Sequence, residues 1–420
     1  TRTFCDGRIE PNIVHALCPA APGATLWIEG ADGACTALTW RADGAANEAI
    51  YLAVRADNRV EVVVRLPDLA GSKAARDWTE CFAVDADGFC HRDTPDGGAI
   101  RDFYHHNLFG GPIEATPLFA KVGAQVVANE RQLNGYAALS GDARTAPASI
   151  CFSLAFRPIM SALSCDELAP GLLHLVHLDN KVEVLGGWPL RDGHKVDVST
   201  AITRVEATVD GLLIVAQSEL SRAGLACAQM RSRFLMRGFD NGILLAANEP
   251  VHAVIQIQDE AELAFVKSHA WLCTSKSAAA GFSVGQSLEI EALACIEQGP
   301  QGTRRFEATG AVSCDGEQVG TLELLATGTG AHPLRALLDT LGKDATVATP
   351  RRQLAVQRCR ATADIEAWAL ISDDLNPIHR SGGIARLAGL PGPIVHGMWT
   401  AARAHSFAIT ALAGGDERRV

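Results

Sequence analysis

One apolar segment followed by three long alternating segments constrains the fold of this chain most strongly. Residues 150–164 are apolar on most sides and long enough for a buried helix. Asp-Gly at 210–211 and Ala-Gly at 223–224 are typical of hairpin turns. The alternating segments that these turns separate lie near 194–209, 211–220 and 225–237. A buried helix followed by antiparallel strands predicts a sheet that wraps around the helix.

Weaker patterns of the same kind lie on both sides of this region. Residues 24–66 alternate in short pieces with turn signals between them, which indicates antiparallel strands. Residues 85–118 are rich in Gly, Asp and Pro, and we expect loops there. Strand-like segments return at 264–273, 287–295, 304–313 and 318–326. Repeated units of helix and antiparallel sheet predict an α+β protein without the strand–helix alternation of a nucleotide-binding fold.

The length of the chain predicts more than one domain. At 420 residues it exceeds the size at which a single core stops growing, so we expect two or three domains. Residues 328–350 are linker-like in composition, and a strand near 353–359 and helices near 362–371 and 394–413 follow. We divide the chain into a β-rich segment 1–149, a helix-and-sheet domain 150–330, a linker 331–352, and a C-terminal domain 353–420 whose sheet is expected to be truncated at Val420.

Charge and composition argue against several classes of function. The formal net charge is -11, and no long basic run is present, which argues against a nucleic-acid partner. No apolar run reaches the roughly 18 residues of a membrane span, and the N-terminus has no signal-peptide pattern. The 12 cysteines are scattered singly without zinc-ligand spacing. We therefore expect a cytoplasmic protein with no membrane, metal or cofactor.

Two short motifs near the C-terminus contain the residue types that proton transfer needs. Asp-Leu-Asn-Pro-Ile-His at 374–379 places a carboxylate and an imidazole five residues apart, in a turn stiffened by Pro377. Leu-Pro-Gly-Pro-Ile-Val-His-Gly-Met at 390–398 is a loop that opens an apolar helix near Gly397. A carboxylate, an imidazole and a helix N-terminus are the parts needed to remove water beside a carbonyl group.

That chemistry assigns a role to each residue. Elimination of water from a 3-hydroxyacyl thioester needs a base for the C2 proton, and an imidazole such as His379 titrates near neutral pH. Asp374 can hold the hydroxyl group and give it a proton. The backbone N–H groups near Gly397 can bind the thioester oxygen, because a helix N-terminus offers unpaired donors.

Each residue also has a purely structural interpretation. Asp-x-Asn-Pro commonly begins a helix, with Asn376 satisfying a turn. A single histidine after a proline turn is more often structural than catalytic. His396 can equally be a buried histidine bonded to the backbone.

The combination of the two motifs resembles the hot-dog hydratase/dehydratase family of MaoC-like enzymes. That signature reads roughly Ser-Gly-Asp-x-Asn-Pro-Ile-His, with Pro-Ile-x-His-Gly downstream, and here it stands at 372–379 and 393–397. This chain departs from it at Asp373, where glycine is usual, a change that is tolerable if Asp373 points to solvent. The segments 171–180, 190–193 and 231–238 look like the dehydratase region of type I fatty acid synthases of the fungal and actinobacterial kind.

The resemblance implies tandem hot-dog folds, each an antiparallel sheet around a central helix, in two or three repeats. Residues 150–330 become a non-catalytic hot-dog that faces the catalytic one. Asp374 and His379 become the catalytic dyad, and Asn376, His396 and Gly397 the positioning and oxyanion residues. The implied partners are an acyl carrier protein domain with a phosphopantetheine thioester, other fatty acid synthase domains, and further copies of the chain.

Two alternatives to a carrier-protein dehydratase remain at this point. An enoyl-CoA hydratase uses the same dyad in the reverse direction, and a structural segment of a megasynthase would not turn over at all. His174 and His177 are expected at tunnel or core positions without chemistry. His105 and His106 are expected on a loop surface, since no third metal ligand is evident in the sequence.

Overall fold

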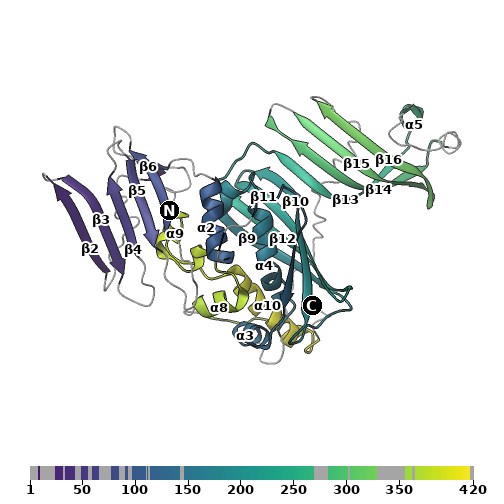
Figure 1. Ribbon diagram of the computed structural model, residues 1–420. Coiled ribbons are helices and arrows are strands. Elements are labelled where there is room, and N and C mark those ends of the chain that lie inside the picture. Colours follow the sequence, from purple (N-terminus) through teal and green to yellow (C-terminus); the bar gives the residue numbers. More distant parts are fainter. Residues whose placement is uncertain are drawn as a thin grey trace. The chain divides into compact units, whose positions relative to one another are not determined.

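The protein is built from antiparallel sheets and helices, as an α+β chain should be (Figure 1). The computed structural model describes residues 8–9, 24–31, 34–42, 49–54, 59–65, 77–84, 90–92, 97–109, 111, 114–141, 146–268, 282–300, 303–328, 355–361 and 365–416. Two compact units are present. Unit 1 holds Thr1–Ala201, Ala216–Phe239 and Gln353–Val420, and unit 2 holds Ile202–Val215 and Asp240–Arg352. The domain boundaries expected from the sequence remain a prediction.

The first strands of unit 1 form one antiparallel sheet in the order β1-β7-β6-β5-β4-β3-β2. The predicted strands within 24–66 are confirmed, and further strands accompany them. The strands are β1 (Arg8–Ile9), β2 (Ala24–Ala31), β3 (Ala34–Ala42), β4 (Ala49–Val54), β5 (Arg59–Arg65), β6 (Trp78–Val84) and β7 (Cys90–Arg92). Val62 and Val64 on β5 are fully buried while their neighbours are not, which is the expected alternation of a strand with one covered face.

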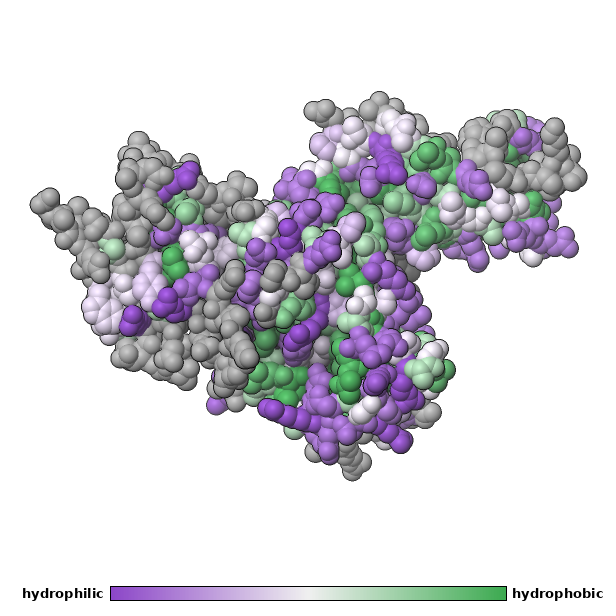
Figure 2. Space-filling view, in the orientation of Figure 1, coloured by the Kyte–Doolittle hydropathy of each residue, from purple (hydrophilic) through white to green (hydrophobic). Residues whose placement is uncertain are grey.

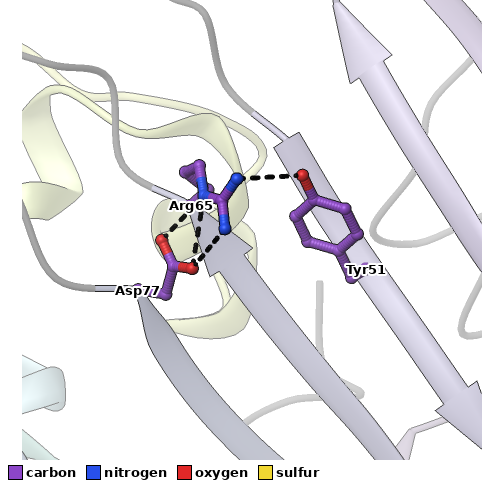
Figure 3. A network of polar contacts seen from close by, with 3 residues as sticks. All are labelled: Tyr51, Arg65 and Asp77. Carbon is purple, nitrogen blue, oxygen red and sulfur yellow. Dashed lines mark hydrogen bonds and ion pairs between the residues drawn. The ribbon is translucent and has the colours of Figure 1, made fainter.

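A polar network links the central strands β4 and β5 with Asp77, the residue before β6 (Figure 3). The Arg65 guanidinium donates to both carboxylate oxygens of Asp77, at 2.9–3.2 Å, and to the Tyr51 hydroxyl at 3.3 Å. It also lies over the Tyr51 ring. Because the Arg65 side chain is 55% exposed, water screens this pair and its contribution to stability is small.

A helix lies in the region 85–118, where we expected only loops. Helix α2 (Gly97–Phe109) buries Ile100, Phe103, Tyr104 and Leu108 along one face. The loop prediction was wrong because the glycines, aspartates and proline before the helix conceal this spacing of three and four residues. The surface position predicted for His105 was also wrong, since its side chain is fully buried on α2.

The predicted buried helix is confirmed, and a sheet covers it. Helix α4 (Ile150–Leu163) has all but two of its residues buried, Arg157 and Ser161 being the exceptions. In unit 1 the adjacent strands follow the order β8-β10-β11-β12-β9. They are β8 (Val122–Val127), β9 (Leu175–Val184), β10 (Lys195–Thr208), β11 (Gly211–Arg222) and β12 (Leu225–Arg237). Helix α4 contacts β8 and β12, so an antiparallel sheet lies against a buried helix, as in a hot-dog fold.

A 3-10 turn leads into the first of these strands after α4, and tight turns join β10 to β11 and β11 to β12. The 3-10 turn η1 (Ala169–His174) leads from α4 into β9, and the Tyr104 hydroxyl donates to the Leu172 carbonyl at 3.0 Å. The predicted hairpin turns are confirmed, since Ala223 and Gly224 both have positive φ angles, of 49° and 79°. Two residues with positive φ suit the twist of a two-residue hairpin.

Short helices complete unit 1. They are α3 (Glu130–Ser140), α8 (Ile365–Ser372), the 3-10 turn η4 (Pro377–His379), α9 (Gly382–Leu387) and α10 (Gly397–Leu412). The predicted helices near 362–371 and 394–413 correspond to α8 and α10. Fully buried Tyr136 of α3 and Trp368 of α8 pack with ring centroids 4.8 Å apart, so α8 is held against α3. None of the described helices is both long and apolar enough to cross a membrane.

Unit 2 is a four-stranded extension with its own core. Its strands β13 (Leu245–Gln256), β14 (Ser287–Gln298), β15 (Arg304–Cys314) and β16 (Glu317–Gly328) pair consecutively and antiparallel. Residues 204–206 of β10, which also belong to this unit, pair with β13. One face carries a continuous apolar cluster around Ile290, Phe306 and Leu322. Polar and apolar side chains are interspersed on the surface of these strands in Figure 2.

Two sequence-based elements differ from the structure in this part. Residues 264–268 belong to helix α5 (Glu260–Ser268), where we expected a strand. Asp259 accepts from the Glu262 N–H at 2.8 Å and Glu262 accepts from the Gln258 N–H at 2.7 Å, a capping box that starts the helix. Residues 355–361 form no strand and are exposed, so the expected strand is absent from the described part of 353–359. Residues 331–352, the expected linker, lie outside the described residues.

Strands β14 and β15 lie so close together at Gly310 that we expect a substitution there to destabilise the protein. A Cβ atom at Gly310 would lie 2.1 Å from the Glu291 carbonyl oxygen and 2.6 Å from the Ala292 Cα atom. Since both are backbone atoms, the strands must move apart. We expect Gly310→Ala to lower the free energy of unfolding by about 1–3 kcal/mol, measured by urea denaturation. Gly123→Ala is the control, because its nearest neighbour is 3.7 Å away; equal midpoints for the two variants would contradict the packing described.

Candidate active site

A chain of local hydrogen bonds shapes the turn that carries the first motif. The Asp374 N–H donates to Ser372 Oγ at 3.3 Å, and the Asn376 N–H donates to Asp374 Oδ1 at 3.2 Å. Asn376 Oδ1 then accepts from the Ile378 N–H at 3.3 Å and caps η4. Each polar side chain therefore satisfies the backbone two residues ahead. The structural interpretation of Asn376 is correct as far as its contacts go.

The turn buries Asp374 and His379 and fixes the His379 ring. Their exposed fractions are 8% and 7%. His379 Nδ1 lies 2.8 Å from the Ile394 carbonyl oxygen. Because a carbonyl oxygen only accepts, Nδ1 carries a proton, and in the neutral form of the ring the lone pair is on Nε2.

His396 is buried beside His379 and bonded to the backbone. Its side chain is 1% exposed, and its Nε2 donates to the Asp374 carbonyl oxygen at 3.0 Å. The His379 and His396 rings stack with centroids 3.9 Å apart. Burial lowers the pKa of His396 to about 4, so its ring is neutral at neutral pH. His396 therefore supports His379 sterically without adding a competing positive charge.

A cavity of about 140 Å³ brings the two motifs together with the wall predicted from the middle of the chain. Asp374, Asn376, His379 and Gly397 line one side, and His396 lies directly behind. The other side consists of side chains from α4, β9 and β12, all within unit 1. Seven residues of the segment 150–330, which we expected to face the catalytic one, line this cavity: Phe152, Phe156, Met160, Leu175, Val176, His177 and Phe234.

Gly397 begins α10 at the edge of the cavity. A Cβ atom added at this position would have nothing within 4 Å, so the space in front of the backbone is open. No side chain caps the helix, and the described residues provide no acceptor for the Gly397 N–H group. An unpaired N–H at a helix N-terminus is a suitable donor to an anionic oxygen.

The unusual residue of the motif, Asp373, has a left-handed backbone and an arginine partner. Its φ angle is 59°, a conformation that glycine adopts freely and aspartate tolerates. Arg157 of α4 binds both oxygens of the Asp373 carboxylate. This bond raises the pKa of Arg157. Asp373 is thus partly buried against α4, so the change from glycine is accommodated by an arginine partner and not by a side chain that points to solvent.

The side chains of Asp374, His379 and His396 form a candidate group for a metal ion among the described residues. One ligand atom each from Asp374, His379 and His396 lies within 4.8 Å of the others. His379 Nδ1 and His396 Nε2 are bonded to carbonyl oxygens. The imidazole nitrogens that could bind a metal are therefore His379 Nε2 and His396 Nδ1. The expected absence of a metal stays a prediction.

Some site residues were missed by the sequence analysis. Arg157 had a usable signal, since it is the only charged residue in an apolar helix. The Ile394 carbonyl had none, because a backbone contact depends on how the loop folds. His174 and His177 were left without a role, and only His177 lines the cavity.

Comparison with known proteins supports the resemblance inferred from the motifs. Residues 343–419 match the family model of the MaoC like domain. A fatty acid synthase beta subunit of Emericella nidulans is 24% identical over 360 residues, which cover 79% of this chain and 19% of that protein. The fatty acid synthase subunit beta of Saccharomyces cerevisiae is 26% identical over 277 residues, or 61% of this chain and 13% of that protein. The chain thus spans less than a fifth of the length of these relatives.

Solved structures give weaker matches. A MaoC-like dehydratase covers 70% of this chain and 78% of its own at 14% identity, with a TM-score of 0.37. HtdX of Mycobacterium tuberculosis covers 49% of this chain and 98% of its own at 16% identity, with a TM-score of 0.26. At such scores the fold description rests on the helices and strands themselves.

The family match and the curated relatives confirm the predicted resemblance. Residues 343–419 of this chain resemble MaoC-like domains, and most of the chain is similar to a segment of the fungal fatty acid synthase beta subunits.

Proposed function

We propose that this protein is a dehydratase that removes water from 3-hydroxyacyl thioesters during fatty acid synthesis and yields trans-2-enoyl thioesters. The observation that carries the proposal is the cavity that holds the lone pair of His379, the Asp374 carboxyl group and the first N–H of α10. Homology to fatty acid synthase beta subunits supports the same substrate class.

His379 is the base in this proposal. Its Nε2 lone pair removes the C2 proton, and the Nδ1–H bond to Ile394 stabilises the imidazolium that forms. The electron pair of the C2–H bond becomes the C2–C3 double bond. As it forms, the C3–O bond breaks.

Asp374 is the acid that assists the departing hydroxyl group. One of its oxygens accepts from the Asn376 N–H, which leaves the other for the substrate. The hydroxyl oxygen receives a proton from the Asp374 carboxyl group and leaves as water. Before the next cycle, the proton that His379 took from C2 passes to Asp374 and restores its protonated carboxyl group.

Gly397 stabilises the thioester oxygen in this scheme. Removal of the C2 proton transfers negative charge to that oxygen, and the N-terminus of α10 faces the cavity with an unpaired N–H. One such donor is typically worth about 2.7–4 kcal/mol of transition-state stabilisation. The open space at Gly397 lets the thioester approach the backbone.

We further propose that the thioester is delivered on an acyl carrier protein domain with a phosphopantetheine arm. Other fatty acid synthase domains are the expected neighbours, in an oligomer formed from copies of the chain. The names of the relatives, which are fatty acid synthase beta subunits, support the other synthase domains as neighbours. Location in the cytoplasm remains a prediction.

The first prediction concerns the dyad. We expect His379→Ala and Asp374→Asn each to reduce kcat for dehydration of a 3-hydroxyacyl thioester by about 10²–10⁴-fold, because each removes a proton-transfer group. The absorbance of the enoyl thioester product measures the reaction. His252→Ala and Asp210→Asn serve as matched controls at exposed positions outside the cavity.

The same assay separates the alternatives. A protein that turns over CoA thioesters but not carrier-bound ones is an enoyl-CoA hydratase of the same family. Release of free thiol, detected with a thiol reagent, would indicate a thioesterase. Wild-type turnover that survives both dyad substitutions would refute the proposed roles, and no turnover of any thioester would favour a structural segment.

The second prediction concerns pH and follows from the buried imidazoles. Burial lowers the pKa of His396 and of His177 to about 4 in the folded protein. Between pH 6.5 and 4 the unfolded chain therefore binds protons that the folded chain does not, so stability falls as the pH decreases. A shift of this size corresponds to at most about 3 kcal/mol for one histidine.

Urea denaturation at several pH values measures this effect. We expect His396→Gln to flatten the decrease between pH 6.5 and 4, whereas His252→Gln, at an exposed position on β13, should leave it unchanged. An identical pH slope for wild type and His396→Gln would show that this imidazole is not held neutral by burial.

A further inference from the structure

A second imidazole lines the cavity beside His379 and has no part in the chemistry proposed so far. His177 lies on β9 and lines the cavity together with Asp374 and His379. Its ring stacks with Phe152 of α4 and with Phe234 of β12, at centroid distances of 4.5 Å and 4.8 Å. Two aromatic side chains thus hold the ring, and its nitrogens are left for polar contacts.

One edge of the ring is bonded to the backbone. His177 Nε2 lies 3.0 Å from the Asp179 carbonyl oxygen and must donate to it. The proton of the neutral ring is thus on Nε2, and Nδ1 carries the lone pair. Burial lowers the pKa of His177 to about 4, so this tautomer persists at neutral pH.

The other nitrogen is an acceptor without a donor. Within the described part of the chain, the hydrogen bond of the His177 ring is that of Nε2. Nδ1 does not belong to the buried atoms that lack a partner, so it stays accessible. The neighbouring cavity side chains Phe152, Phe156, Met160 and Phe234 have no donor groups, and a ligand in the cavity that carries a donor can bond to Nδ1.

The donor that the proposed substrate brings closest is its 3-hydroxyl group. That hydroxyl must lie at Asp374, and Asp374 and His177 line the same cavity of about 140 Å³. A hydroxyl group has one hydrogen to donate and two lone pairs. It can therefore accept the proton of Asp374 and donate its own hydrogen to a second acceptor.

We propose that His177 Nδ1 accepts a hydrogen bond from the 3-hydroxyl group and makes the site specific for 3-hydroxyacyl thioesters. This inference rests on the proposed function. His177 and Asp374 then both hold the hydroxyl group, and the hydrogen bonded to His177 leaves with the water. His177 is a substrate-binding residue that takes no proton in the reaction.

Two variants at one position test the inference. His177→Phe keeps an aromatic ring in contact with Phe152 and Phe234 and removes the Nδ1 acceptor. His177→Asn keeps an acceptor, because its side-chain oxygen takes a position similar to that of Nδ1. Both are assayed in the dehydration direction with a 3-hydroxyacyl thioester and in the hydration direction with the matching enoyl thioester.

The two directions should respond differently. For His177→Phe we expect the KM of the 3-hydroxyacyl thioester to rise about 3- to 10-fold, as for loss of one hydrogen bond, with kcat within about twofold of wild type. The enoyl thioester has no hydroxyl group, so its KM should not change. Its kcat should fall by the same factor, because the overall equilibrium constant is fixed. His177→Asn should restore most of the lost specificity.

Other outcomes would overturn the inference. An unchanged KM for the 3-hydroxyacyl thioester in His177→Phe would do so, as would an equal rise in KM for both substrates, which indicates a general packing defect. Should His177→Phe fail to fold by circular dichroism, His177→Leu replaces it with the same expected pattern. A wild-type protein that turns over neither thioester would refute the proposed function, whereas normal wild-type turnover without the expected pattern would refute this inference alone.

Discussion

The structure of unit 1 depends on the burial of helix α4. A helix that is apolar on nearly every side must be covered on every side, and one sheet can cover only part of it. Strands β8 and β12 contact it from the sheet, and α8 contacts it from the C-terminal segment. Helix α8, which begins more than 200 residues after α4 ends, therefore packs against it. The cavity lies in this region, with α4 residues in its wall.

The one charged residue of α4 lies where the helix meets the C-terminal segment. Arg157 binds Asp373, which directly precedes Asp374, and Asp373 has the left-handed backbone of a position where the family signature has glycine. Glycine would adopt this conformation without any partner, whereas aspartate adopts it and is bound to the helix as well. The substitution thus replaces a flexible backbone position with one attached to α4. Its effect is to couple the position of the Asp374 turn to the opposite wall of the cavity.

How far the sequence predicts this structure depends on the range of the interactions involved. Helix α4 and strands β10–β12 have strong periodic patterns, and their prediction was correct. Helix α2 was missed because its apolar spacing starts within a run of glycines, and the start of α5 depends on the capping pair Asp259 and Glu262. The same limit applies to the site: the spacing of Asp374 and His379 is local, but the contacts of Arg157 and His177 come from distant segments.

Backbone carbonyls determine the chemistry available to all three imidazoles. His379, His396 and His177 each donate one N–H to a carbonyl oxygen, of Ile394, Asp374 and Asp179 respectively. Each bond fixes a tautomer, and the atom left with the lone pair is Nε2 in His379 but Nδ1 in the other two. The same residue type therefore leaves a different ring nitrogen free in one position than in the other two. Because a carbonyl oxygen can only accept, the position of the proton on each ring follows from the fold of the two loops and of β9. A substitution that moves one of these carbonyls would therefore change which nitrogen is free, without altering any side chain in the cavity.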